Sequence, residues 1–242
     1  TALVRSDWII DFCNEIISRN MKITFQMPAG TRSECINYQV AKKLKAAGCH
    51  ELAFAPESGD PRVLKSIKKK INLTHMYKSA KETLQAGINV GCFFIIGFPE
   101  DNYISVLKTY TAIIKCALIG FTNVNLNAYS PQPNTESFKN LQESGVIKEL
   151  SDEYLISLFT FQDFGARKTS FNPRFSDYEL SVLVIIGTGL FYFFYFTRKP
   201  QRIFFLIRDL FSETAENKSS KILKSALKDC KNIFRFKMRK LF

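Results

Sequence analysis

The chain has 242 residues, of which 46% are hydrophobic, and its mean hydropathy is −0.07. This composition excludes a wholly disordered chain, because disordered chains are poorer in apolar residues. The formal net charge of +12 is unevenly spread: residues 197–242 hold 13 cations and 4 acids, whereas residues 1–196 hold 21 and 18. We therefore expect no nucleic-acid partner for the body of the chain, and we expect the basic tail to suit an acidic surface.

Four apolar, β-rich runs predict strands over residues 23–27, 51–55, 90–96 and 122–128, each ending in Gly or Pro turn residues. Helical periods over 35–47, 74–86 and 105–118 follow the first three runs. Thr74 is the predicted N-cap of the second helix, and Gly87 is the predicted residue beyond its end. This alternation predicts βα units, a parallel sheet and an α/β fold.

The fourth run has one polar and one apolar face, since Asn123, Asn125 and Asn127 alternate with Val124, Leu126 and Ala128. One apolar face favours a barrel, because a doubly wound sheet needs both faces apolar. In barrels the functional residues lie at the carboxyl ends of the strands. This chain places Arg32, Glu57, Ser58, Gly97 and Pro131 there.

Beyond residue 135 the chain is predicted to be helical, over 151–164, 178–196, 202–211 and 219–241. We expect two domains: a partial barrel over 1–135, and a helical extension with a basic amphipathic tail over 136–242. Residues 180–196 carry no charge over 17 positions. They would form about 26 Å of helix against a hydrocarbon core of ~30 Å, so a packed helix is favoured and a membrane span is the alternative.

Two strand ends carry candidate binding residues. Glu57 and Ser58 could grip a diol such as a ribose, Gly59 permits close approach to the backbone, and the helix predicted over 62–67 offers free N–H groups. The alternative is that they cap the turn. Gly97 and Phe98 suit backbone contact with a flat ring, although a tight βα turn is the favoured explanation from the residues alone.

Elsewhere the sequence favours structural roles. Arg32 could bind a carboxylate through its planar fork, or lie free on the surface. The six cysteines are at least 14 positions apart and form no CxxC-type pair. With no secretory leader, they are interpreted as buried thiols in a reducing cytoplasm. Neither histidine has metal-ligand spacing, and no nucleophile triad, P-loop or GxGxxG pattern is present.

Two segments resemble radical S-adenosylmethionine (SAM) enzymes: residues 44–60, LKAAGCHELAFAPESGD, and residues 86–100, AGINVGCFFIIGFPE. Residues 129–135, YSPQPNT, are similar to the family's next strand end, with Asn134 in place of a glycine, which asparagine can replace in the left-handed region. The resemblance covers residues 3–135. Residues 194–200, FYFTRKP, resemble the C-terminal end of cobalamin-binding radical SAM proteins.

The resemblance implies a TIM-type barrel that binds SAM beside a [4Fe–4S] cluster, with cobalamin as a further cofactor. It implies a 5′-deoxyadenosyl radical that abstracts a substrate hydrogen, for methyl transfer or cyclisation. Matched by position, the ribose would lie at Glu57, Ser58 and Gly59, the adenine at Gly97, Phe98, Ser130 and Pro131, and the methionine carboxylate at Arg32. Asn125 and Asn127 would line the substrate cavity.

The family's CxxxCxxC cluster motif is absent, so we expect no metal ligand and no catalytic residue in this chain. We expect it to be the C-terminal part of a longer cytoplasmic enzyme, with peripheral contact at the inner membrane surface through the tail. Its partners would be a small-molecule or lipid-like substrate and an electron donor such as flavodoxin or ferredoxin. The alternatives are a membrane-associated interaction protein that uses residues 180–196 and the tail, and another barrel enzyme such as an aldolase.

Overall fold

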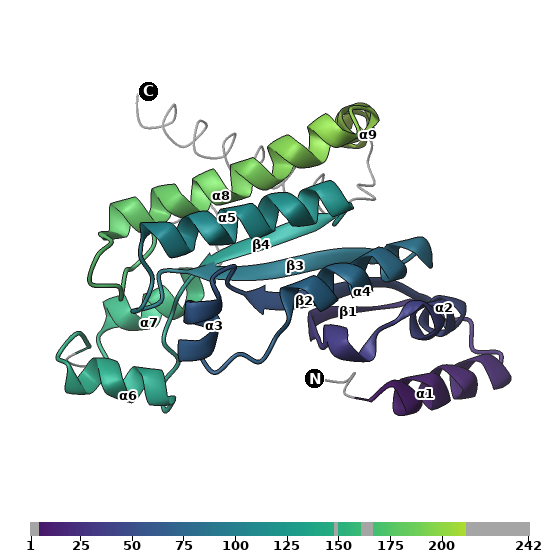
Figure 1. Cartoon of the computed structure of the whole chain (residues 1–242), viewed down its shortest axis with the longest axis horizontal. Helices are drawn as coiled ribbons and strands as arrows, with labels where there is room; N and C mark the ends of the chain where they lie inside the picture. Colours follow the sequence, from purple (N-terminus) through teal and green to yellow (C-terminus); the bar gives the residue numbers. More distant parts are fainter. Residues whose placement is uncertain (1–4, 148–149, 161–166, 212–242) are drawn as a thin grey trace, which may run out of the picture. The chain divides into compact units, whose positions relative to one another are not determined.

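Four parallel strands form one sheet, in the order in which they occur in the chain (Figure 1). The computed structural model describes residues 5–147, 150–160 and 167–211. The strands are β1 (Phe25–Thr31), β2 (Cys49–Glu57), β3 (Asn89–Ile96) and β4 (Asn123–Ala128). A sequential order is typical of a β/α barrel, whereas a doubly wound sheet reverses its order near the middle. The predicted α/β class and partial barrel are confirmed.

A row of helices covers the sheet, and the short helix α3 (Pro61–Ser66) follows the end of β2. The row consists of α1 (Ser6–Ser18), the 3-10 turn η1 (Ser33–Cys35), α2 (Tyr38–Ala46), α4 (Leu73–Gln85) and α5 (Tyr103–Ile119). Along this row, α1 contacts α2, α2 contacts α4 and α4 contacts α5. The strand residues that join the helices in the core include Leu52, Phe54, Cys92, Phe94, Val124 and Leu126.

The other face of the sheet carries the alternate residues, because successive side chains of a strand point to opposite sides. There Phe93 pairs with Asn125, and Ile95 pairs with Asn127. The predicted polar row of β4 therefore lies on the face away from the main helical layer, next to apolar residues of β3.

Several element boundaries differ from the sequence prediction. The turn predicted at residues 28–30 is wrong, since β1 continues through Pro28 to Thr31. Proline lacks an N–H donor, and β1 is an edge strand, so it tolerates the loss. The predicted N-cap Thr74 is also wrong: the side chain of Asn72 accepts the His75 N–H and α4 begins at Leu73. Gly87 lies beyond the end of α4 with a φ of 82°, as predicted.

The remaining helices are α6 (Glu136–Glu143), α7 (Asp152–Thr160), α8 (Asp177–Arg198) and α9 (Gln201–Phe211). α1 and α6 have no counterpart among the predicted helices. The amphipathic helix predicted over 219–241 lies outside the described residues. The chain forms two compact units, Thr1–Tyr195 and Phe196–Phe242, while the division at residue 135 stays a prediction.

α8 lies alongside α5 (Figure 1). Its buried side is a stripe of Leu180, Val184, Gly187 and Phe191, and the Tyr110 hydroxyl donates to the Leu183 carbonyl at 2.6 Å. Among the described helices, α8 alone has the length and apolar composition of a membrane span, and only 22% of its most apolar window is buried. The buried stripe supports the packed-helix interpretation.

The two glycines of α8 provide a test of this packing. A Cβ at Gly187 would lie 2.4 Å from Leu126 Cδ2, whereas one at Gly189 has no atom within 4 Å. We expect Gly187→Ala to lower the free energy of unfolding by roughly 1–3 kcal/mol through overpacking. Gly189→Ala should raise it by roughly 0.5–1 kcal/mol, because alanine favours the helix. Urea denaturation measures both, and equal effects would contradict the packing.

Candidate functional site

The predicted binding residues gather at one edge of the sheet. Parallel neighbouring strands end on the same side, and β1 to β4 are all parallel neighbours. Arg32 follows β1, Glu57 ends β2, and Gly97 follows β3. Ser130 and Pro131 come two and three residues after β4 ends. The structure therefore brings every predicted strand-end residue to the same rim.

At the end of β2, Glu57 and Ser58 face different partners. Glu57 lies in the left-handed region, at a φ of 67°, and its Oε1 is 2.9 Å from Lys69 Nζ. Ser58 is 1% exposed. Its hydroxyl accepts the Asp60 N–H at 3.1 Å and lies 3.3 Å from the Thr109 hydroxyl. Ser58 thus holds the turn, as the capping alternative supposed.

Gly59 approaches a helix closely. A Cβ there would lie 2.4 Å from the Lys108 carbonyl oxygen, and the Gly59 N–H donates to the Thr109 hydroxyl at 3.0 Å. In the structure, the lack of a side chain at Gly59 therefore allows the β2 turn to pack closely against α5. The number of free N–H groups at the start of α3 is also smaller than predicted, because the Asp60 side chain accepts the Arg62 N–H.

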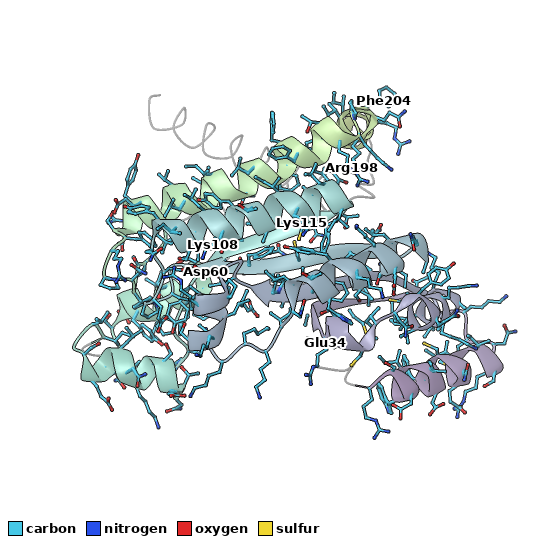
Figure 2. The ribbon with its side chains drawn as sticks, in the orientation of Figure 1. Glu34, Asp60, Lys108, Lys115, Arg198 and Phe204 are labelled. Carbon is cyan, nitrogen blue, oxygen red and sulfur yellow. The ribbon has the colours of Figure 1, made fainter. Side chains whose placement is uncertain are left out.

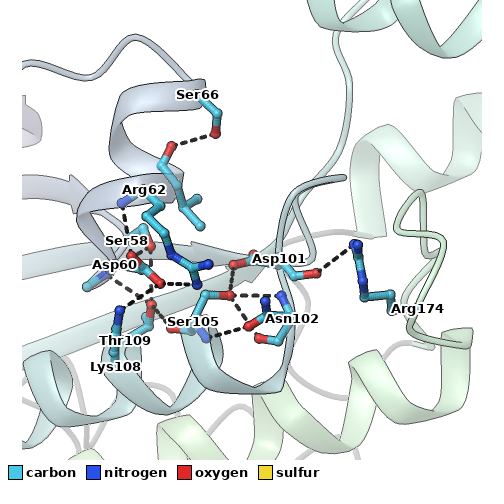
Figure 3. Close-up of polar contacts among 12 residues, drawn as sticks. Ser58, Asp60, Arg62, Ser66, Asp101, Asn102, Ser105, Lys108, Thr109 and Arg174 are labelled. Carbon is cyan, nitrogen blue, oxygen red and sulfur yellow. Dashed lines mark hydrogen bonds and ion pairs between the residues drawn. The ribbon is translucent and has the colours of Figure 1, made fainter.

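Asp60 is the charged centre of this turn (Figures 2 and 3). Its side chain is 0% exposed and lies 2.9 Å from Arg62 Nη2 and 3.2 Å from Lys108 Nζ. Burial raises the pKa of this carboxyl, but the hydrogen bonds from Arg62 and Lys108 outweigh it and lower the pKa to about 2. Asp60 is thus ionised at neutral pH and braces α3 against α5.

At the end of β3, the turn is held by a buried carboxylate. Asp101 Oδ2 accepts the N–H groups of Gly97 and Phe98, at 2.9 and 3.1 Å. Its Oδ1 accepts the Ser105 hydroxyl at 2.5 Å (Figure 3). Burial raises the pKa of Asp101, although these bonds act in the opposite direction. Gly97 has a φ of 89°, so this position favours glycine for conformational reasons.

Aromatic rings close the rim between β3 and β4. Phe98 is 6% exposed, and its ring centroid lies 4.8 Å from that of Tyr129. The Pro131 carbonyl accepts the Tyr154 hydroxyl at 2.6 Å. Asn134 adopts a φ of 66°, which confirms that asparagine fills a left-handed position here.

A cavity of about 290 Å³ lies at the ends of β1 and β2. Four cations line it, Arg32, Lys68, Lys69 and Lys70, against one acid, Glu34. Its wall also includes Ser33, which is 2% exposed. Among the described residues, the buried hydroxyls of Ser33 and Ser130 are the ones without a hydrogen-bond partner. Three of these cations already have a carboxylate partner, since Arg32 pairs with Glu34, Lys68 with Glu136 and Lys69 with Glu57. An anionic group in the cavity would share the cations with these carboxylates.

Sequence reasoning singled out Arg32 in this cavity but did not use the lysines, Ser33, Asp101 or Thr109. The three successive lysines, Lys68 to Lys70, are the feature of the sequence that could have predicted a cationic cavity. Asp101 and Thr109 had no such signal, because their partners are far away in the chain. Asn125 and Asn127 lie on the opposite face from the core residues of β4; Asn127 is 8% exposed.

The thiols of the described residues do not form a metal site. Within residues 5–147, 150–160 and 167–211, no three His, Cys, Asp or Glu side chains are placed to hold a metal ion. Burial raises the pKa of Cys13 and Cys49 to about 11, which disfavours the thiolate that binds metals. These residues therefore do not fit an iron–sulfur cluster.

Comparison with known proteins gives a family match over residues 2–113, to the model described as the radical SAM superfamily. A stretch of 74 residues is 37% identical to an uncharacterized methyltransferase of Pyrococcus horikoshii, and covers 31% of this chain and 16% of that protein. Cytidylyl-2-hydroxyethylphosphonate methyltransferase of Streptomyces wedmorensis is 26% identical over 133 residues, 53% of this chain and 25% of that protein.

A third relative is tRNA-2-methylthio-N(6)-dimethylallyladenosine synthase of Deinococcus radiodurans, 28% identical over 130 residues, which are 50% of this chain and 24% of that protein. The chain thus spans a quarter or less of these relatives. Among solved structures, the radical SAM methyltransferase TsrM of Kitasatospora setae has a TM-score of 0.47 at 14% identity, with 56% of this chain and 27% of that chain covered. Methylornithine synthase has a TM-score of 0.43 at 13% identity, with 77% and 51% covered.

The Asp60 brace makes a prediction about pH. The folded-state pKa of about 2 lies below the ordinary value of 3.8, so the stabilisation is present above about pH 4 and is lost as the pH falls towards 2. We expect Asp60→Asn, which keeps an N-cap acceptor, to cost roughly 2 kcal/mol at pH 7 and much less at pH 2.5. Denaturant titrations at both pH values measure this.

Glu143→Gln removes an exposed carboxylate from α6 and controls for the loss of a charge. The brace would be refuted by an Asp60→Asn penalty that is the same at both pH values.

Proposed function

Residues 2–113 match the radical SAM superfamily, and we propose that the carboxyl ends of β1–β4 bind SAM in an enzyme of this family that removes hydrogen from its substrate. The superfamily uses SAM together with an iron–sulfur cluster. When bound, this pair supplies a 5′-deoxyadenosyl radical. The observation that carries the proposal is the cationic cavity beside Glu57, at the same rim as the Gly97 turn.

The methionine carboxylate of SAM would occupy this cavity. The Arg32 side chain is 55% exposed and lies 4.0 Å from Glu34, and Lys69 in the same wall pairs with Glu57. The SAM carboxylate would therefore share both cations with these two acids. The unpartnered Ser33 hydroxyl supplies a neutral donor. A carboxylate satisfies both needs, because it accepts several hydrogen bonds and carries one negative charge.

The ribose would lie at Glu57. Its Oε1 is engaged by Lys69 at 2.9 Å, and that ion pair orients the carboxylate for a diol, which donates two hydrogen bonds. Ser58 and Gly59 shape the turn below it. The adenine would lie against the backbone of Gly97 and Phe98, with Ser130 and Pro131 on the side of β4. The buried Ser130 hydroxyl has no partner and suits a ring nitrogen.

The iron–sulfur cluster needs ligands from outside the described residues, because those residues hold no candidate metal site. The residues that remain for the substrate are Asn125 and Asn127, beside Phe93 and Ile95 on the same face. Amides between apolar side chains suit a small-molecule or lipid-like substrate with a few polar groups.

Methyl transfer is the reaction we propose, since two of the relatives are named methyltransferases. Cyclisation is the alternative outcome. We propose cobalamin as a further cofactor, from the resemblance of residues 194–200, and a flavodoxin or ferredoxin as the electron donor.

Binding of SAM analogues by this chain tests the proposal. S-adenosylhomocysteine has the adenosyl group and the carboxylate, whereas 5′-methylthioadenosine lacks the carboxylate. We expect Arg32→Gln to weaken binding of S-adenosylhomocysteine about tenfold, the cost of one charge-assisted hydrogen bond. Binding of 5′-methylthioadenosine should be unchanged. Ligand-observed NMR titrations give both constants.

Lys65→Gln, on the exposed side of α3, is the matched control and should change neither constant. A chain that binds neither analogue would overturn the proposal of a SAM site at this rim.

We propose a cytoplasmic location, with membrane contact at one exposed apolar row. Ile185, Ile186 and Phe193 on α8 are 49%, 45% and 61% exposed, and the tail is basic. We expect the double variant Ile185→Lys, Phe193→Lys to reduce cosedimentation with anionic phosphatidylglycerol vesicles at least threefold, since apolar area drives such binding. Trp8→Lys, at another exposed apolar site, is the control. If the parent chain does not cosediment with the vesicles, the proposal of membrane contact is wrong.

A further inference from the structure

We propose that the segment before α8 positions the adenine-binding turn, and that Asn172 is its positioning residue. This inference rests on the proposed SAM site at the strand ends. In this proposal, residues of the helical extension hold the rim of the sheet in one conformation.

Asn172 uses the NH₂ group of its amide on this turn and the oxygen within its own segment. It is 6% exposed, and its Nδ2 donates to the carbonyls of Phe98 and Asp101, the second at 3.1 Å. Its Oδ1 accepts the Arg174 N–H at 2.7 Å. An asparagine amide has two donors and one acceptor oxygen, so a side chain of this size without the NH₂ group cannot make the same contacts.

The turn is held from its other side by Asp101. That carboxylate accepts the N–H groups of Gly97 and Phe98, while Asn172 binds the Phe98 carbonyl. The Phe98 N–H is therefore held by the Asp101 carboxylate, while its carbonyl accepts both the Asp101 N–H, at 2.9 Å, and the Asn172 amide from the extension. A turn held in this way presents its ring and backbone in one geometry, which lowers the ordering cost of binding a flat ring.

The extension also holds the neighbouring turn after β4. The Tyr154 hydroxyl of α7 donates to the Pro131 carbonyl at 2.6 Å. The Tyr154 ring meets that of Phe171, next to Asn172 in the chain, with centroids 6.2 Å apart. In addition, the Leu180 side chain fills the space that a Cβ at Gly97 would need. The residues of the extension that contact the two turns assigned to the adenine are thus Tyr154, Asn172, Arg174 and Leu180.

The test separates the adenine end of the site from its carboxylate end. In Asn172→Asp the side chain keeps its size but loses both donors. We expect binding of S-adenosylhomocysteine and of 5′-methylthioadenosine to weaken together, each about tenfold. Arg32→Gln should weaken only the first. Asn140→Asp, at an exposed amide of α6, is the matched control.

Tyr154→Phe provides a second variant if Asn172→Asp does not fold, because it removes only the hydroxyl on Pro131. It should weaken both analogues about threefold. The inference is overturned if the variant that folds loses unfolding free energy but binds 5′-methylthioadenosine as tightly as the parent chain, since that result describes a structural residue alone. If the parent chain binds neither analogue, the proposed SAM site fails and the inference falls with it.

Discussion

The rim of this sheet depends on the polar side chains at the start of α5. Asp101 is 1% exposed, and a buried carboxylate is costly unless donors surround it. Here the donors are two backbone N–H groups of the β3 turn and the Ser105 hydroxyl. Asp101 lies two residues before α5 begins and is held by Ser105 of that helix. One turn further along the same helix face, the Thr109 hydroxyl reaches the β2 turn through the Gly59 N–H. One helix face therefore contributes to both strand ends.

The site divides into a charged half and a fixed half. On the side of β1 and β2, the cations are partly exposed: the side chains of Arg32 and Lys69 are 55% and 35% accessible. On the side of β3 and β4, the groups that hold the turns, Asp101, Asn172 and Tyr154, are each at most 6% exposed. Exposed cations act at a distance and attract an anion, whereas buried hydrogen bonds define orientation. Under the proposed function, the carboxylate of SAM would lie at the charged half and its flat base at the fixed half.

Local patterns in the sequence predicted the four strands, the parallel sheet and the rim on which the candidate residues lie. They failed where a distant partner decides the outcome. The edge position of β1 allows a strand to pass through Pro28, and only the strand order reveals it. Gly59 was attributed to ligand access, yet the neighbour that requires a glycine is α5. Asn172 acts on residues more than 70 positions earlier, so no spacing rule within one segment could identify it.

Four thiols of this chain lie in the apolar core and not at the rim of the sheet. Cys13, Cys49, Cys92 and Cys116 are all buried in the apolar core, where desolvation raises the pKa of Cys13, Cys49 and Cys92. Core thiols pack as small apolar groups, whereas cluster ligands must be thiolates close together at an accessible loop. The rim, by contrast, carries cations, the carboxylates of Glu34 and Glu57, and the unpartnered hydroxyls of Ser33 and Ser130. Under the function proposed above, these groups would bind SAM, and the ligands of the iron–sulfur cluster would come from outside the described residues.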